Sequence, residues 1–373
     1  MHIGIDARFF GPEGKGLGRY TEKLVKNLEI IDSFNQYTIF LREENWDYYQ
    51  PENPRFRKIK APFRWYSLKE QVSFPRLIKA QKLDLMHFPH FNVPLFYYQP
   101  FIVTIHDLII THFPTTRATT LGPARYFLKR LGYQWVISSA VKRSRKVITV
   151  SEYTKRELVS YFRLNPDKVA VTYEAAEPFS AAPTPAQDVL AKYKINEPYI
   201  LYVGNAYPHK NLELLLEAFA ELKERFPELK LVLVGRLDYF YGRLKNKSES
   251  MGLASRVVFP GYISDEDLPG LYQKAMLYVF PSLAEGFGLP PLEAMQYGLP
   301  VVASSTSCLP EVLGRGAAYF DPKSKHAIVK VLSDLINDSP ARDNLRQLGY
   351  RQVKTYRWPK MAEQTLALYE QQK

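Results

Sequence analysis

The sequence predicts an α/β protein with two doubly wound parallel sheets, and three observations lead to this prediction. Short apolar runs bounded by turn residues alternate with helix-period stretches, the pattern of parallel strands covered by helices on both faces. The length of 373 residues exceeds what one hydrophobic core usually supports. A polar stretch with three prolines, 174–188, separates the two series of runs and is the expected linker.

The expected elements fall into two domains, 1–180 and 190–355. In the first, strands are expected at 2–6, 37–41, 85–88, 101–107, 146–151 and 168–173, with helices such as 20–30, 124–142 and 152–162. In the second, strands are expected at 199–204, 230–235, 257–261, 277–282 and 301–304. The last segment, 356–373, has a helical apolar pattern and is expected to pack back on the first domain. Because open α/β sheets bind ligands outside the carboxyl ends of their strands, both domains are expected to face a shared cleft.

Composition excludes several classes of protein. The apolar fraction of 46% and the charged fraction of 24% are those of a soluble globular chain. The single cysteine, Cys308, excludes an internal disulfide and a cysteine metal cluster, and favours a reducing compartment. No window approaches about 18 uninterrupted apolar residues, and the first residues read as a strand, so no secretion signal is expected there. We therefore expect a cytoplasmic protein.

Positive charge is concentrated in the first half. Residues 1–176 carry 27 Lys and Arg against 16 Asp and Glu, whereas the rest carries 23 against 22. The first half is thus expected to meet an anionic partner such as a membrane surface, a polyphosphate or a nucleic acid. Region 125–146 mixes aromatic residues with cations; it either contacts the inner face of a membrane peripherally or forms a buried helix with a solvated basic side. No recognition motif supports a nucleic acid.

A strand, a glycine loop and a helix start follow one another at 277–298. Pro290 and Pro291 are expected to open the helix, which stops at Gly298. Backbone N–H groups and the positive end of the helix dipole would favour a diphosphate or clustered hydroxyls there. Glu293, expected in the first turn, can accept from a ribose diol, and Glu285 from sugar hydroxyls. Alternatively, Glu293 only stabilises the helix as a first-turn acid, and Glu285 is only a solvated charge in the loop.

The string EGFGLPPLEAMQYGLPVVAS, 285–304, resembles the glutamate–seven residues–glutamate motif of glycosyltransferase family 4, a retaining family with the GT-B fold. The resemblance extends over nearly the whole chain through segments 14–24, 104–108, 147–158, 202–212, 257–268 and 307–314. It implies metal-independent transfer of a hexose of the mannose or glucose type from a GDP- or UDP-sugar. The implied acceptor is a glycan or lipid-linked saccharide in polysaccharide or lipopolysaccharide biosynthesis, with no cofactor besides the donor substrate.

The resemblance also implies roles for residues of the second domain. Glu293 would hold the donor's ribose and Glu285 the transferred sugar, beside Lys210, which would neutralise the diphosphate. Donor contacts are further implied for the backbone amides of Phe287, Gly288 and Leu289, and for the nucleotide-base segment with Tyr262 and Ile263. Asn205 stands where the family often has a second cation, an arginine; His209 or Arg236 could compensate.

Two residues of the first domain complete the implied site. Gly16 matches a glycine whose backbone approaches the diphosphate, and GKGLG between a strand and a helix is either a phosphate-binding turn or a plain tight turn. His106 follows a strand at its carboxyl end and matches a histidine that contacts the sugar. The alternative is a structural histidine. The neighbouring Asp107 could cap the next turn.

One possible metal site has to be considered. Asp265 and Asp267 have the spacing of a metal site, but Ser264 ahead of them favours an N-cap with first-turn acids.

Two other classes of protein are alternatives to a transferase. A GT-B-fold nucleotide-sugar epimerase or hydrolase shares the fold, although the order of the motifs favours a transferase. The basic first half leaves a nucleic-acid-binding protein as a third hypothesis.

Overall fold

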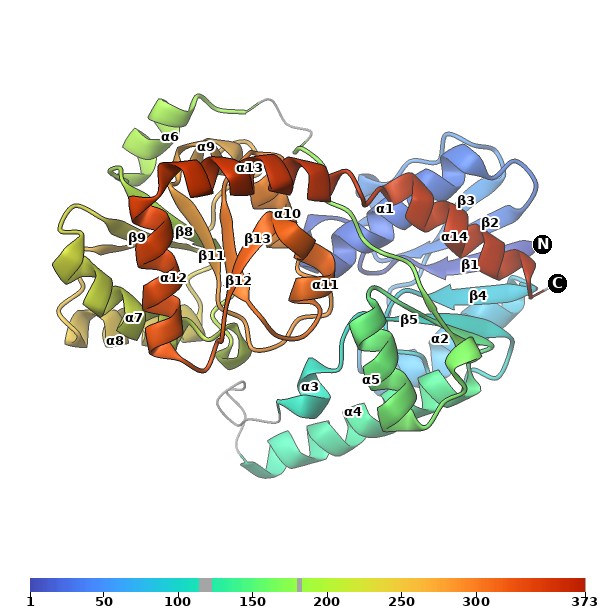
Figure 1. The fold of residues 1–373 in the computed structure, drawn as a ribbon. Coiled ribbons are helices and arrows are strands. Elements are labelled where there is room, and N and C mark those ends of the chain that lie inside the picture. The colour runs from blue at the N-terminus through green and yellow to red at the C-terminus, as the bar shows by residue number, and fades with distance from the viewer. Residues whose placement is uncertain (114–122, 180–182, 373) are drawn as a thin grey trace. The chain divides into compact units, whose positions relative to one another are not determined.

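The computed structural model describes residues 1–113, 123–179 and 183–372, and the chain divides into two compact units. Unit 1 is Met1–Glu174 with Arg357–Lys373, and unit 2 is Ala175–Tyr356. Each unit contains one parallel sheet with helices between its strands (Figure 1). The predicted doubly wound α/β class is therefore confirmed.

The sheet of unit 1 has the strand order β3-β2-β1-β4-β5-β6-β7. The chain winds outward from β1 to one side and from β4 to the other, so these two neighbours form the switch point. The strands are β1 His2–Asp6, β2 Gln36–Leu41, β3 Phe56–Lys60, β4 Leu85–Phe88, β5 Phe101–Ile105, β6 Lys146–Thr149 and β7 Val169–Val171. The helices are α1 Lys15–Ile31, α2 Leu68–Ala80, α3 Ile109–His112, α4 Pro123–Arg143, α5 Glu152–Phe162 and α14 Trp358–Glu370.

The sheet of unit 2 has the order β10-β9-β8-β11-β12-β13, with its switch point between β8 and β11. Its strands are β8 Tyr199–Val203, β9 Lys230–Val234, β10 Val257–Gly261, β11 Leu277–Phe280, β12 Val301–Ser304 and β13 Ala317–Phe320. Its helices are α6 Ala186–Tyr193, α7 Leu212–Arg225, α8 Tyr239–Ser250, α9 Leu268–Lys274, α10 Leu289–Gln296, α11 Leu309–Leu313, α12 Lys325–Asn337 and α13 Ser339–Val353.

Two strands, β3 and β13, were not predicted. Both lie at the edge of their sheet and pair with one neighbour only. The sequence of β3, FRKIK, has three cations among its five residues, and the four residues of β13 follow a Gly-Arg-Gly turn. An edge strand needs less apolar surface than a central one, so the sequence signal is weak at these positions.

The final helix, α14, belongs to unit 1 and packs along α1 (Figure 1). Trp358 and Tyr369 of this helix are fully buried. The Tyr369 hydroxyl lies 2.5 Å from Nδ1 of His87, whose Nε2 lies 2.8 Å from the Thr104 hydroxyl. Burial, then the charge of His106, lowers the pKa of His87 to about 3, so this ring is neutral and links α14 to strands β4 and β5.

Candidate active site

Gly288 connects the glycine loop of unit 2 to α10. Its φ of +92° is left-handed, and a Cβ placed there would lie 2.9 Å from Cδ2 of Leu309. Helix α10 begins at Leu289, one residue earlier than expected. Of the first four N–H positions of a helix, two are here Pro290 and Pro291, which carry no N–H. The helix start therefore offers a ligand the amides of Gly288 and Leu289.

We predict that Gly288→Ala lowers the free energy of unfolding by about 1–3 kcal/mol, because an L-residue is strained at this φ. Denaturant unfolding measures the change. Gly242→Ala, in α8, is the matched control, since a Cβ there meets nothing within 4 Å; it should be neutral or stabilising by about 0.5–1 kcal/mol. Equal losses in both variants would contradict a special backbone at Gly288.

Glu285 and Lys210 form an ion pair at the carboxyl edge of the sheet. Lys210 ends the 3-10 helix Pro208–Lys210 after β8, and Glu285 lies in the loop after β11. The Nζ atom of Lys210 lies 2.5 Å from Oε1 of Glu285. The side chain of Lys210 is only 13% exposed and that of Glu285 only 10%. The Phe280 ring centroid is 5.5 Å from the same Nζ. The attraction between the Lys210 ammonium and the Glu285 carboxylate is stronger in such apolar surroundings than in water.

The loop after β12 holds the glycine loop in place. The Ser307 hydroxyl accepts a hydrogen bond from the Glu285 backbone N–H at 3.1 Å. Sγ of the buried Cys308 lies 3.3 Å from the carbonyl oxygens of Glu285 and Phe287. Phe287 is itself buried, with its ring against Tyr356. Ser307 and Cys308 were not predicted as part of the site, although they begin the segment 307–314 that carries the family resemblance.

Glu293 lies in the second turn of α10 rather than the first, so the expected placement was wrong. It is the fifth residue of the helix because α10 starts directly after Gly288. The residue is 6% exposed, and the Tyr272 hydroxyl donates to its Oε2 at 3.4 Å. Burial and this contact, more than the helix N-terminus, define the surroundings of the Glu293 carboxylate.

Asn205 has a structural role in the loop after β8. Its carbonyl accepts from the Tyr202 hydroxyl at 2.7 Å, and its side-chain Oδ1 accepts from the Tyr207 N–H at 3.3 Å. Burial, then the charge of Lys210, lowers the pKa of His209 to about 4. His209 is therefore neutral at neutral pH and supplies no second positive charge. Arg236 is exposed at the end of β9.

The segment after β10 is divided between surface and core. Tyr262 is 70% exposed, whereas the Ile263 side chain is buried. Gly261, with a φ of +85°, turns the chain between the strand and this pair. The Tyr262 ring is accessible to a ligand, but Ile263 can reach one only through its backbone.

Asp267 is the N-cap residue of α9, which begins at Leu268; Ser264 therefore does not cap this helix. Pro269 occupies the first turn, a position that suits proline. The carboxylate of Asp267 accepts from Thr184, Lys192 and Tyr193 at 2.6–2.7 Å. The hydrogen bonds from Lys192 and Thr184 hold the pKa of Asp267 at about 2, despite the opposing effect of desolvation. This carboxylate fastens α6 to α9.

His106 follows β5 in unit 1, and both ring nitrogens face acceptors. Nδ1 lies 3.1 Å from Oε1 of the buried Glu174, and Nε2 lies 3.0 Å from the Pro89 carbonyl oxygen. The Tyr20 ring meets His106 edge-on at 4.7 Å. Burial lowers the pKa of His106, but Glu174, the Pro89 carbonyl and Asp107 outweigh it and hold the pKa above its ordinary value. The imidazolium form is therefore more stable here than in a free histidine.

We predict that the stabilising effect of His106 weakens as pH rises. Because the folded-state pKa is raised, the contribution is fully present below the ordinary pKa of 6.5 and is lost as pH passes through the raised value. The difference in unfolding free energy between the parent protein and His106→Gln, measured from pH 5.5 to about 8.5, should fall with pH. A difference that stays constant over this range would contradict the paired imidazolium.

Gly16 lies in the first turn of α1, not in the loop where it was expected. It is exposed, and a Cβ built on it meets nothing within 4 Å. Gly18, by contrast, would place its Cβ 2.0 Å from the Gly11 carbonyl oxygen. The fold thus requires glycine at position 18, whereas nothing within the fold requires it at position 16.

A carboxylate, a lysine and the amides of a helix start lie at the switch point of the second parallel sheet, where open α/β sheets bind phosphate-bearing ligands. The family model described as Glycosyltransferase Family 4 matches residues 14–177, and the model described as Glycosyl transferases group 1 matches residues 187–352. The O-antigen chain mannosyltransferase B of Escherichia coli is 30% identical, over 95% of this chain and 96% of its own length. The chain belongs to glycosyltransferase family 4 and is a glycosyltransferase.

Solved structures share the fold along the whole chain. Sucrose-phosphate synthase from Thermosynechococcus elongatus has a TM-score of 0.77 at 21% identity, covering 100% of this chain and 98% of its own. Anabaena HepE, in complex with UDP and glucose, has a TM-score of 0.75 at 16% identity and covers 99% of both chains. The GT-B fold expected from the sequence is confirmed.

Proposed function

We propose that this enzyme transfers a hexose of the mannose or glucose type from a GDP- or UDP-sugar to a glycan or lipid-linked acceptor in polysaccharide or lipopolysaccharide biosynthesis. Domain 190–355 binds the donor, and domain 1–180 the acceptor. The observation that carries the proposal is the Lys210–Glu285 pair beside the start of α10. A diphosphate needs the cation and the amides, and sugar hydroxyls need the carboxylate.

Names of similar proteins support a hexose donor. The Escherichia coli relative is an O-antigen chain mannosyltransferase, and the Anabaena structure holds UDP and glucose. Mannose and glucose differ in one hydroxyl orientation, so a few contacts decide between them. Both nucleotides remain in the proposal.

In the proposed reaction, the bond between the anomeric carbon and the diphosphate oxygen breaks while the acceptor hydroxyl oxygen bonds to that carbon on the same face. The hydroxyl proton passes to the departing phosphate. Lys210, with the amides of Phe287, Gly288 and Leu289, stabilises the negative charge that develops on the diphosphate. Glu285 and His106 position the sugar. No step requires a metal ion.

Further donor contacts surround this centre. Glu293 binds the ribose, and Tyr262, with the backbone of Ile263, contacts the nucleotide base. Asn205 orders the loop that carries Lys210, through its bond to the Tyr207 N–H. The exposed Arg236 is the remaining candidate for a second cation.

A peripheral contact with an anionic membrane surface, on its cytoplasmic side, is part of the proposal. The helix concerned is α4, which exposes Phe127, Leu131 and Trp135. Exposed aromatic residues on a basic helix are typical of interfacial helices. Among the helices of the described ranges, none is long and apolar enough to cross a bilayer.

Thermal unfolding with GDP-mannose, UDP-glucose and their free nucleotides tests the donor assignment. A nucleotide sugar at about a hundredfold excess over its Kd should stabilise the protein by about 2.7 kcal/mol. Transfer to saccharide acceptors, followed with the stabilising donor, then tests the reaction. Unchanged melting with every nucleotide sugar, or consumption of the donor that is indifferent to acceptor, would contradict the proposal and favour a hydrolase or epimerase.

We predict that Gly16→Ala reduces transfer without reducing stability. The added methyl group meets no neighbour in the fold but narrows the approach of the donor diphosphate to the start of α1. Displacement of a donor by about 1 Å can cost up to a hundredfold in rate. Gly242→Ala, equally free of contacts, is the control for rate and melting temperature. An unchanged kcat/KM in Gly16→Ala would remove Gly16 from the donor site.

A further inference from the structure

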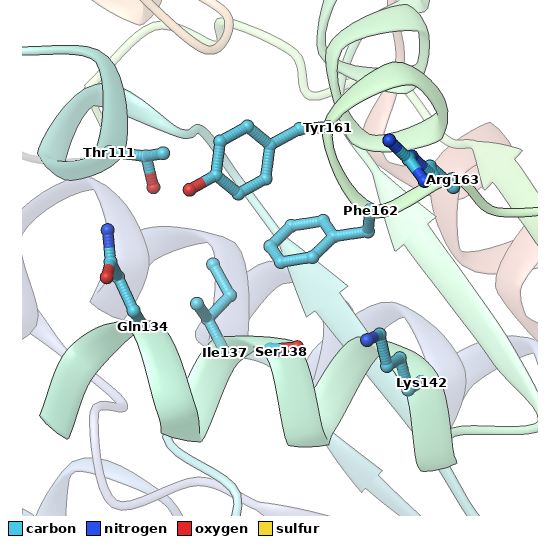
Figure 2. A pocket seen from close by; sticks show the side chains of 8 residues that line it. All are labelled: Thr111, Gln134, Ile137, Ser138, Lys142, Tyr161, Phe162 and Arg163. Atoms are coloured by element: carbon cyan, nitrogen blue, oxygen red, sulfur yellow. The ribbon is translucent and has the colours of Figure 1, made fainter. Parts of the chain in front are cut away.

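A pocket of about 410 Å³ lies in unit 1 between α3, α4 and the end of α5. Figure 2 shows Gln134, Ser138 and Lys142 along one side of α4, with Tyr161, Phe162 and Arg163 opposite. Lys142 and Arg163 lie at one end, whereas Gln134 and the Tyr161 hydroxyl lie at the other (Figure 2). None of these residues belongs to the proposed donor site.

Two cations define one end of the pocket. In the described ranges, neither Lys142 nor Arg163 takes part in an ion pair. Arg163 caps α5 with a φ of +53° and a ψ of +50°, a left-handed conformation that favours glycine or asparagine. A third cation, Lys168, donates from Nζ to the Lys142 carbonyl oxygen at 2.7 Å. An anion with several oxygens, such as a phosphate ester, matches this end.

An apolar stripe on α4 leads into the same pocket. Phe127, Leu131, Trp135, Ser138 and Lys142 follow one another at intervals of three and four residues, so they share one side of the helix. The first three are exposed, and Trp135 reaches 71%. A ligand that joins an anionic head to apolar chains would therefore meet cations in the pocket and apolar side chains along the stripe.

We propose that this pocket binds the phosphate headgroup of an anionic phospholipid, so that the stripe of α4 lies in the bilayer interface. The inference rests on the proposed membrane contact and sharpens it to one site. A phosphate ester in solution carries the same phosphate group as the lipid headgroup, but it has no acyl chains to cover the exposed apolar stripe of α4. The pocket lies within unit 1 and shares no residue with the proposed donor site.

Vesicle flotation tests the proposal with the full chain. The probes are phosphatidylcholine vesicles with and without phosphatidylglycerol, and glycerol phosphate in solution. Lys142→Gln with Arg163→Asn removes both pocket charges, and asparagine suits the left-handed position. Lys129→Gln with Arg156→Gln is the matched control, because these exposed residues of α4 and α5 lie outside the pocket. Transfer to a soluble acceptor should stay unchanged in both variants.

The expected result is binding to phosphatidylglycerol vesicles that weakens about thirtyfold in the pocket variant, and clearly less in the control. Equal weakening in both variants would overturn the pocket, because charge anywhere on the surface would then suffice. Absence of vesicle binding by the parent protein would overturn it too. Stabilisation by glycerol phosphate without vesicle binding would assign the pocket to a soluble phosphate ester. None of these outcomes depends on transfer activity, so failure of the donor proposal is seen separately.

Discussion

Replacing Glu285 with alanine is expected to lower kcat/KM by about 10²–10³ while the protein remains folded. The variant removes the proposed sugar contact, and it also removes the carboxylate 2.5 Å from Lys210. The loss should appear mainly in kcat, because the proposed role of the carboxylate is to align the reacting sugar rather than to bind the nucleotide. Steady-state kinetics, with circular dichroism as the test of folding, measures the effect.

Two further variants test whether the charge of Glu285 and its pairing with Lys210 are needed. Glu285→Gln keeps the shape but not the negative charge, and Lys210→Met removes the cation. If the pair acts as one unit, the double variant should lose less activity than the product of the single losses. Turnover by Glu285→Ala at the parent rate would overturn the assignment, whatever the stability of the variant.

Glu293→Gln is expected to weaken donor binding by about tenfold to a hundredfold and to leave kcat at saturating donor nearly unchanged. Hydrogen bonds to a charged group contribute about 1.5–3 kcal/mol, and the amide keeps the shape and an acceptor for the Tyr272 hydroxyl. Calorimetric titration with the nucleotide measures the change directly.

A ligand without ribose hydroxyls makes this second prediction specific. The 2′,3′-dideoxy nucleotide should bind the parent protein and Glu293→Gln equally, because the proposed partners of Glu293 are then absent. Tyr272→Phe is the control for the neighbouring hydroxyl. Equal affinity of the parent protein and Glu293→Gln for the ribonucleotide would show that Glu293 is a structural acid.

The central strands of both sheets could be predicted because they are buried on both faces and form continuous apolar runs. Edge strands β3 and β13 lacked that signal. Glu293 was placed in the first turn because two prolines indicated the helix start. In the structure Gly288 takes a left-handed φ and α10 begins at Leu289, ahead of both prolines. The space beside Gly288 is also limited by Leu309, a residue 21 positions further along the chain, and such a tertiary contact is not visible in the local sequence.

By itself, the sequence determined the α/β class, the family resemblance and the residue types at each proposed donor contact, because these depend on local periodicity and on motif order. The tertiary structure alone decided which of them meet. Lys210 and Glu285 are 75 residues apart and come together because β8 and β11 are neighbours at the switch point. His106 and Glu174 are 68 residues apart and meet at the carboxyl edge of the other sheet. Pairings of this kind follow from strand order, a long-range property that no local pattern contains.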